Sequence, residues 1–133
     1  MTARRNISTA TPWETRFGYS REVVAGSMAF VSGTVAADHT GRIHAPRDAA
    51  GQARYIYEKI AHALVQAGAS LRDIVRVRVY LTNIADIEAV GLVHNEFFAD
   101  VRPANSTLAV AALAAPECLM EIEVDAVLPE ALS

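Results

Sequence analysis

The segment that most constrains the fold is residues 74–81, where apolar and polar side chains alternate with a period of two. This alternation predicts a β-strand with one buried and one open face. The face expected to be buried carries Val75, Val77, Val79 and Leu81. The open face carries Arg76, Arg78 and Tyr80. Helical periods of three and four residues flank the strand, over 48–68 and from Asn83 to about Ala99. Because both helices connect strands, right-handed crossovers place them on the same face of one sheet.

Shorter apolar runs supply the other strands of this sheet. Residues 23–25 and 28–32 flank Gly26-Ser27, a two-residue connection typical of a β-hairpin because glycine accepts the positive φ of such a turn. Ile43 follows a second turn and is expected to begin a short edge strand. Two further strands are expected near 106–110 and 119–127. The order ββ(β)αβαββ predicts an α+β fold, a two-layer domain with a mixed β-sheet and two helices on one face.

The composition narrows the class of protein. The chain has 133 residues, 52% of them hydrophobic, and a net charge of −3. We therefore expect a single domain spanning residues 1–133, with an irregular N-terminal segment over 1–16. The charge gives no field that would attract nucleic acid or a membrane surface. Neither a signal peptide nor an apolar run of the ~18 residues of a membrane span is recognised, so a soluble cytoplasmic protein is expected.

Metal-binding and cofactor motifs are absent from the sequence. Its four histidines do not form a pair at i, i+4 with a neighbouring acid, and its glycines do not form a phosphate loop. Cys118 is the only cysteine, which excludes an internal disulfide and indicates a small packing residue. We expect no metal and no cofactor.

Two carboxylates lie close together in the last expected strand. Glu121 and Glu123 are two residues apart and share a face, and such proximity raises one pKa in a way that suits acid–base chemistry. The alternative is that one of them forms an ion pair with an arginine at a subunit interface. The open sheet face, with Arg76, Arg78 and Tyr80, itself predicts a homo-oligomer, because small domains usually cover such a face with another subunit.

Residues 102–107 read Arg-Pro-Ala-Asn-Ser-Thr and residues 120–123 read Met-Glu-Ile-Glu. Together with the corner Val31-Ser32-Gly33 and residues 68–81, these segments resemble the reactive-intermediate deaminase family, also called Rid or YjgF. The resemblance extends from about Phe17 to Val127. It implies a chorismate-mutase-like fold and a homotrimer with ligand clefts between subunits. It also implies hydrolysis of imines and enamines, such as 2-aminoacrylate, without a cofactor.

The resemblance also implies which residues form the cleft. Tyr19 lies thirteen residues before Ser32, the family's spacing for a cleft tyrosine and its Ser-Gly corner, so Tyr19, Ser32 and Gly33 are expected to bind substrate. Thr107 corresponds to a position that lines the cleft. Glu121 corresponds to the catalytic glutamate that positions water.

Two family positions differ in this chain. The arginine that binds the substrate carboxylate is replaced by Asn105, and an asparagine of the last helix by Gly91. Asparagine is shorter and neutral, and losing a hydrogen bond to a charged group costs about 1.5–3 kcal/mol. We therefore expect poor activity on 2-aminoacrylate, with Asn105 still contributing to the pocket.

Another arginine is a candidate to replace the missing one. Arg76 and Arg78 lie on the face that a trimer turns toward the subunit interface, and Arg78 is taken as a substrate-binding residue. The alternative is that both pair with acidic residues of a neighbouring subunit. Arg102 lies three positions from Asn105 and points elsewhere if the segment is extended.

The leading functional interpretation is a cofactor-independent hydrolase of a small imine, enamine or related C–N compound. The alternative is a non-catalytic protein that binds a small metabolite in the same cleft, as a sensor or store. A third interpretation is a structural or chaperone-like trimer. Ribonuclease activity, described for some members of the family, has little support from a pI near 5.8 and the lack of a catalytic histidine pair.

Overall fold

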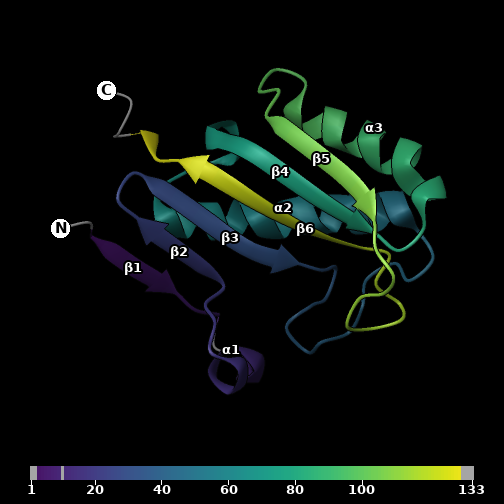
Figure 1. Cartoon of the computed structure of the whole chain (residues 1–133), viewed down its shortest axis with the longest axis horizontal. Coiled ribbons are helices and arrows are strands. Elements are labelled where there is room, and N and C mark those ends of the chain that lie inside the picture. Colours follow the sequence, from purple (N-terminus) through teal and green to yellow (C-terminus); the bar gives the residue numbers. More distant parts are fainter. Residues whose placement is uncertain (1–2, 10, 130–133) are drawn as a thin grey trace.

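The structure is a computed structural model that describes residues 3–9 and 11–129 (Figure 1). The described strands form one six-stranded sheet in the order β1-β2-β3-β6-β4-β5. Their bounds are Arg4–Ile7 (β1), Glu22–Ala25 (β2), Met28–Thr34 (β3), Ile74–Leu81 (β4), Ala104–Ala109 (β5) and Met120–Val127 (β6). The helices are Pro12–Phe17 (α1), Ala49–Ala67 (α2) and Ile87–Phe98 (α3), with 3₁₀ turns at Leu71–Asp73 and Ile84–Asp86. Neighbouring strands are antiparallel except β4 and β5.

Helices α2 and α3 cover the same face of the sheet, as Figure 1 shows. This arrangement confirms the predicted α+β fold with a mixed sheet. The connection through α3 explains why β4 and β5 are parallel, because a parallel pair requires a crossover. The short helix α1 is an addition to the two predicted helices, and it lies beyond the end of the sheet.

Helix α2 begins and ends where the sequence predicts. The side chain of Asp48 accepts a hydrogen bond of 3.0 Å from the backbone N–H of Gly51, which caps the first turn. Gly68 ends the helix in the left-handed conformation, with φ 85°. Between them, Ala53, Ile56, Tyr57, Ile60 and Leu64 are buried on one face and form the core with the sheet. None of the described helices is long and apolar enough to cross a membrane.

Strand β4 corrects one detail of the predicted alternation. Val77, Val79 and Leu81 are buried as expected, but Val75 is 44% exposed and Ile74 is buried in its place. The register with β6 shifts between Ile74 and Arg76. This β-bulge adds one residue to β4, which reverses the alternation before Arg76.

The N-terminal segment is not irregular as predicted over residues 1–16. Arg4–Ile7 forms β1, which pairs with β2, and Pro12–Phe17 forms α1. The signals for α1 are present in the sequence: Pro12 occupies the first turn, and Gly18 ends the helix with φ 74°. Six residues are too few to show a helical period, and β1 is too polar to show alternation.

The loop that follows β3 is held by α2. The Lys59 ammonium donates to the carbonyl oxygens of Val35, at 2.9 Å, and Ala37, at 2.7 Å. Ile43 forms one isolated bridge with Ala37 rather than the expected short edge strand. The Asp38 carboxylate makes the intervening turn by accepting hydrogen bonds from the backbone N–H groups of Thr40 and Arg42.

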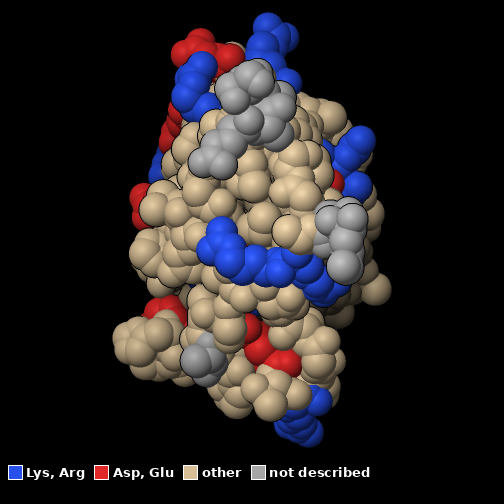
Figure 2. All heavy atoms as spheres, turned by 90° about the vertical axis from the view of Figure 1, so that its left-hand side faces the viewer, with Lys and Arg blue, Asp and Glu red and all other residues tan. Residues whose placement is uncertain are grey.

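Strand β1 forms a positively charged edge of the sheet. Arg4 and Arg5 are exposed on it, and Figure 2, which looks onto this side of the molecule, shows Lys and Arg atoms in a band across the middle. Positive side chains on an edge strand oppose pairing with a second copy of the same edge. Association of copies through this edge is therefore disfavoured.

The face of the sheet opposite α2 and α3 carries both polar and apolar side chains. Arg78 Nη1 lies 3.4 Å from Asp125 Oδ2, and the Tyr80 hydroxyl donates to Glu123. Phe30 and Leu108 are each 42% exposed, and their register partners Asp125 and Tyr80 place them on this face. Within the described residues, no helix covers it.

Candidate functional site

Glu121 and Gly33 meet where β3 separates from regular pairing with β6. The register between these strands shifts between Val31 and Thr34, and the Glu121 side chain lies directly against Gly33. A Cβ atom at position 33 would lie 2.7 Å from Glu121 Cδ, much closer than two carbon atoms approach. Glycine at this position therefore leaves the room that the Glu121 carboxylate occupies.

Ser32 connects this corner to the segment before β2. Its Oγ donates a hydrogen bond of 2.7 Å to the carbonyl oxygen of Ser20, and its backbone N–H donates to the carbonyl oxygen of Arg21 at 3.0 Å. Tyr19, which precedes Ser20, is exposed at this end of the hairpin. The Ser32 hydroxyl is thus occupied in holding the corner.

Arg21 is the residue of this site that the sequence analysis missed. Its Nη2 donates a hydrogen bond of 2.6 Å to the carbonyl oxygen of Gly33. Burial lowers the pKa of the Arg21 guanidinium, while nearby acidic groups, Tyr19 and Glu121 among them, act in the opposite direction. Arg21 therefore joins four predicted site residues: Tyr19, Ser32, Gly33 and Glu121.

The predicted hairpin contained the signal for Arg21. A two-residue turn at Gly26-Ser27 pairs Ala25 with Met28 and Glu22 with Val31, so the next pair along the hairpin is Arg21 and Ser32. The hydrogen bond from the Ser32 N–H to the Arg21 carbonyl confirms this register. The direction of the arginine side chain, however, is not determined by register alone.

Lys59 and Cys118 lie near the same end of β3. Burial, and to a smaller extent the charge of Arg21, lowers the pKa of Lys59 to about 8. Asp38 and Cys118 act in the opposite direction and raise it. Burial also raises the pKa of the Cys118 thiol, and a thiol held protonated is a poor nucleophile. The structure supports a packing role for Cys118 and a tethering role for Lys59.

Asn105 and Thr107 lie apart from this group within one chain. In the parallel pair of β4 and β5 they lie beside Val77 and Val79, whose side chains face the helices, whereas Glu121 lies on the opposite face beside Tyr80. Strand β4 also separates β5 from β6. Thr107 Oγ1 donates to Asn105 Oδ1 at 2.9 Å. One chain does not bring these two residues to Glu121.

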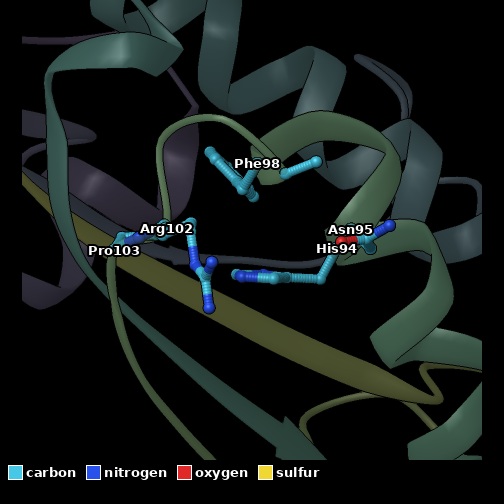
Figure 3. A pocket seen from close by; sticks show the side chains of 6 residues that line it. His94, Asn95, Phe98, Arg102 and Pro103 are labelled. Atoms are coloured by element: carbon cyan, nitrogen blue, oxygen red, sulfur yellow. The ribbon is translucent and has the colours of Figure 1, made fainter.

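A pocket of about 400 Å³ lies at the end of α3. Its lining consists of His94, Asn95, Phe98, Ala99, Arg102 and Pro103. Figure 3 shows the side chains of Arg102 and His94 side by side, with Phe98 on the other side of the opening. Arg102 adopts φ 53°, which turns the chain from α3 into β5. Arg102 thus contributes to this pocket and not to the Glu121 group.

The remaining candidates lie on the open sheet face. Arg78 pairs with Asp125 of its own chain, and Glu123 accepts the Tyr80 hydroxyl, a bond that raises the pKa of Tyr80. Of the two neighbouring carboxylates, Glu121 is therefore the one left available. Among the described residues, no three His, Cys, Asp or Glu side chains gather where a metal ion could be held.

Comparison with known proteins agrees with these features. Residues 9–128 match the family described as Endoribonuclease L-PSP. The crystal structure of Rv2704 from Mycobacterium tuberculosis, a member of the YjgF/YER057c/UK114 family, is 40% identical. It superposes with a TM-score of 0.84 over 94% of this chain and 99% of its own. The chain belongs to the YjgF (Rid) family.

Two sequence relatives extend this YjgF (Rid) assignment. The 3-aminoacrylate deaminase RutC of Acinetobacter baylyi is 36% identical over 98 residues, which are 74% of this chain and 77% of RutC. An uncharacterised protein of Streptomyces coelicolor is 32% identical over 124 residues, which are 93% of this chain and 92% of that protein. Both the deaminase and the ribonuclease names therefore occur among this chain's relatives.

Gly91, the second position at which this YjgF (Rid) chain departs from the expected motif, lies in α3. Apart from its two chain neighbours and the backbone of α3 itself, no atom lies within 4 Å of the place where a Cβ would be at this residue. Position 91 is therefore open space in the single chain.

Proposed function

We propose that this YjgF (Rid) protein hydrolyses a small imine or enamine, with Glu121 positioning the attacking water. The observation that carries the proposal is the Glu121 carboxylate packed against Gly33 at the open end of β3. Glu121 makes no hydrogen bond to another side chain within residues 3–9 and 11–129, so its oxygens are available to water. The name of the 36% identical relative, 3-aminoacrylate deaminase, supports the same chemistry.

The proposed reaction requires little more than this carboxylate. Solvent water donates a proton to the enamine carbon, which gives an iminium ion. Glu121 accepts a hydrogen bond from a second water and takes its proton as the water oxygen bonds to the iminium carbon, which gives a carbinolamine. Glu121 then returns this proton to the nitrogen, the C–N bond breaks as ammonia leaves, and the hydroxyl loses its proton to solvent, so that a carbonyl compound remains.

We also propose that the site is completed in a homotrimer located in the cytoplasm, with the ligand in a cleft between subunits. Two observations support this assembly. The open sheet face exposes Phe30 and Leu108, and a small domain usually buries such a face against another copy. The predicted site residues Asn105 and Thr107 lie on the other face from Glu121, so a neighbouring copy is needed to bring both groups to one ligand.

The test is an assay on freshly generated imines. An amino-acid oxidase produces imines from several amino acids, and semicarbazide traps those that survive. We expect the protein to reduce trapping well below the uncatalysed level for at least one amino acid. Binding of a small ligand without any such effect would favour the alternative, a non-catalytic metabolite-binding protein. Light scattering on the same preparation is expected to give about 43 kDa, three times the 14.3 kDa of one chain.

Gly33→Ala is expected to impair the reaction while leaving the fold intact. The added methyl group displaces the carboxylate end of Glu121, which is flexible, so the free energy of unfolding changes by less than about 1 kcal/mol. A misplaced catalytic group lowers the rate by about 10²-fold. Denaturant unfolding and the imine assay measure the two effects. Wild-type turnover in this variant would show that the Glu121 position is unimportant.

A further inference from the structure

Arg21 carries a half-buried positive charge that has no ion-pair partner among the described residues. Within the described residues the ion pairs are Arg54–Glu96 and Arg78–Asp125, and Arg21 takes part in neither. A guanidinium has five N–H donors, but the hydrogen bond from Nη2 to the Gly33 carbonyl is the one that Arg21 makes with them. Its Nε is buried and has no hydrogen-bond partner among these residues.

Such an arrangement is costly unless an anion completes it. Burying a charge without a partner, or a donor without an acceptor, costs free energy that a ligand can offset. The Gly33 carbonyl orients the guanidinium by holding Nη2. Nε is buried, whereas Nη1 is not among the buried donors without a partner. Nη1 and Nη2 each have an N–H on the outer edge of the planar group, and such a pair binds a carboxylate through two parallel bonds.

The position of Arg21 relative to Glu121 suits a single small ligand. Both side chains contact Gly33, Arg21 through the carbonyl oxygen and Glu121 through the α-carbon side. Arg21 and Glu121 are close enough to influence each other electrostatically, yet they do not form an ion pair. A ligand lying over Gly33 would have its carboxylate at Arg21 and its reacting carbon near Glu121.

The other arginines are less suited to this role. Arg78 is paired with Asp125 on the open face, and Arg102 lines the pocket at the end of α3. Asn105 has no charge to offer and lies on the other side of the sheet.

We propose that Arg21 binds the substrate's carboxylate and selects imines and enamines of 2-oxo acids over neutral ones. This inference rests on the proposed function for the class of reaction. In the family motif an arginine at the position of Asn105 binds the substrate carboxylate. The inference assigns this role to Arg21 instead.

The test compares the binding of pyruvate with that of pyruvamide, its neutral counterpart, by titration calorimetry. Wild-type protein is expected to bind pyruvate at least about tenfold more tightly than pyruvamide. Arg21→Gln is expected to weaken pyruvate binding by about tenfold to hundredfold and to leave pyruvamide binding unchanged. Arg21→Lys, which keeps the charge but not the fork, is expected to lie between them. The matched control is Arg72→Gln, which removes an exposed charge from the turn before β4.

The outcomes separate this inference from the proposed function. Equal binding of pyruvate and pyruvamide to the wild type would overturn the role of Arg21. An equal loss of both probes in Arg21→Gln would also overturn it, since it would indicate that Arg21 only holds Gly33. Circular dichroism identifies an unfolded variant, in which case Arg21→Lys decides the result. If pyruvate is preferred through Arg21 but no imine is hydrolysed, the inference stands and the hydrolase proposal fails.

Discussion

Glu121→Gln is expected to lower kcat for imine hydrolysis by about 10²–10⁴-fold, with a small change in KM. The amide keeps the size of the side chain and its place against Gly33, but it does not accept the proton of the attacking water. Steady-state assays with the best imine measure the effect, and light scattering should show the same mass for variant and wild type.

Glu123→Gln provides the comparison for Glu121→Gln. Glu123 lies on the same face of β6 but accepts the Tyr80 hydroxyl, so its replacement should change kcat only a few-fold. Equal losses in the two variants would contradict the assignment of the reaction to Glu121. If the wild type shows no turnover and Glu121→Gln changes only ligand affinity, the metabolite-binding interpretation is correct.

Glu22→Gln is expected to stabilise the folded protein by about 3 kcal/mol at pH 8 and to have little effect at pH 4.5. Glu22 is 0% exposed, and neither of its carboxylate oxygens has a hydrogen-bond partner in the described structure. Burial raises its pKa to about 7, against the opposite effects of Arg5 and Arg21.

The direction of the pH dependence follows from this raised pKa. Between about pH 4.5, the ordinary value for a glutamate, and about pH 7 the folded state holds the proton that the unfolded state releases. The contribution of Glu22 to the stability of the wild type is therefore most favourable below pH 4.5, falls as the pH rises through this window and is level above pH 7. In Glu22→Gln this part of the pH dependence disappears.

Denaturant unfolding at a series of pH values, at one protein concentration, measures this effect. Glu58→Gln is the matched control because Glu58 is exposed on α2. It should keep the wild-type slope. If Glu22→Gln shows the same slope as the wild type between pH 4.5 and 7, Glu22 does not carry a buried, shifted carboxyl.

Much of the fold was predictable because its signals are local. The alternation in 74–81, the helical period in 48–68 and the hairpin at Gly26-Ser27 depend on residues a few positions apart, and each element appears where it was expected. Asp48 and Gly68 mark the ends of α2 through their own cap geometry. The polar strand β1, the six-residue helix α1 and the bulge that exposes Val75 lack such signals, since pairing with other strands creates them.

The candidate site was predictable in part, and through resemblance rather than physical chemistry. Tyr19, Ser32, Gly33 and Glu121 were expected together from the family motifs, and the structure joins them through Arg21. Asn105 and Thr107 were expected in the same cleft, yet in one chain they lie on the other face of the sheet. If the site is shared between subunits, each chain by itself brings together only some of the site residues, as observed here.

The sequence by itself determined the α+β order of elements from β2 to β6 and the helix-covered face of the sheet, and its resemblance to the family placed the glutamate near a glycine corner. Those features follow from periodicity, turn chemistry and short motifs. Only the tertiary structure decided that Arg21 and Glu121 both contact Gly33, that Arg78 pairs with Asp125, and that Glu22 is buried without a hydrogen-bond partner among the described residues. The physical reason is that partners and burial depend on strand register and on which segments cross. These are set by packing between residues far apart in the chain.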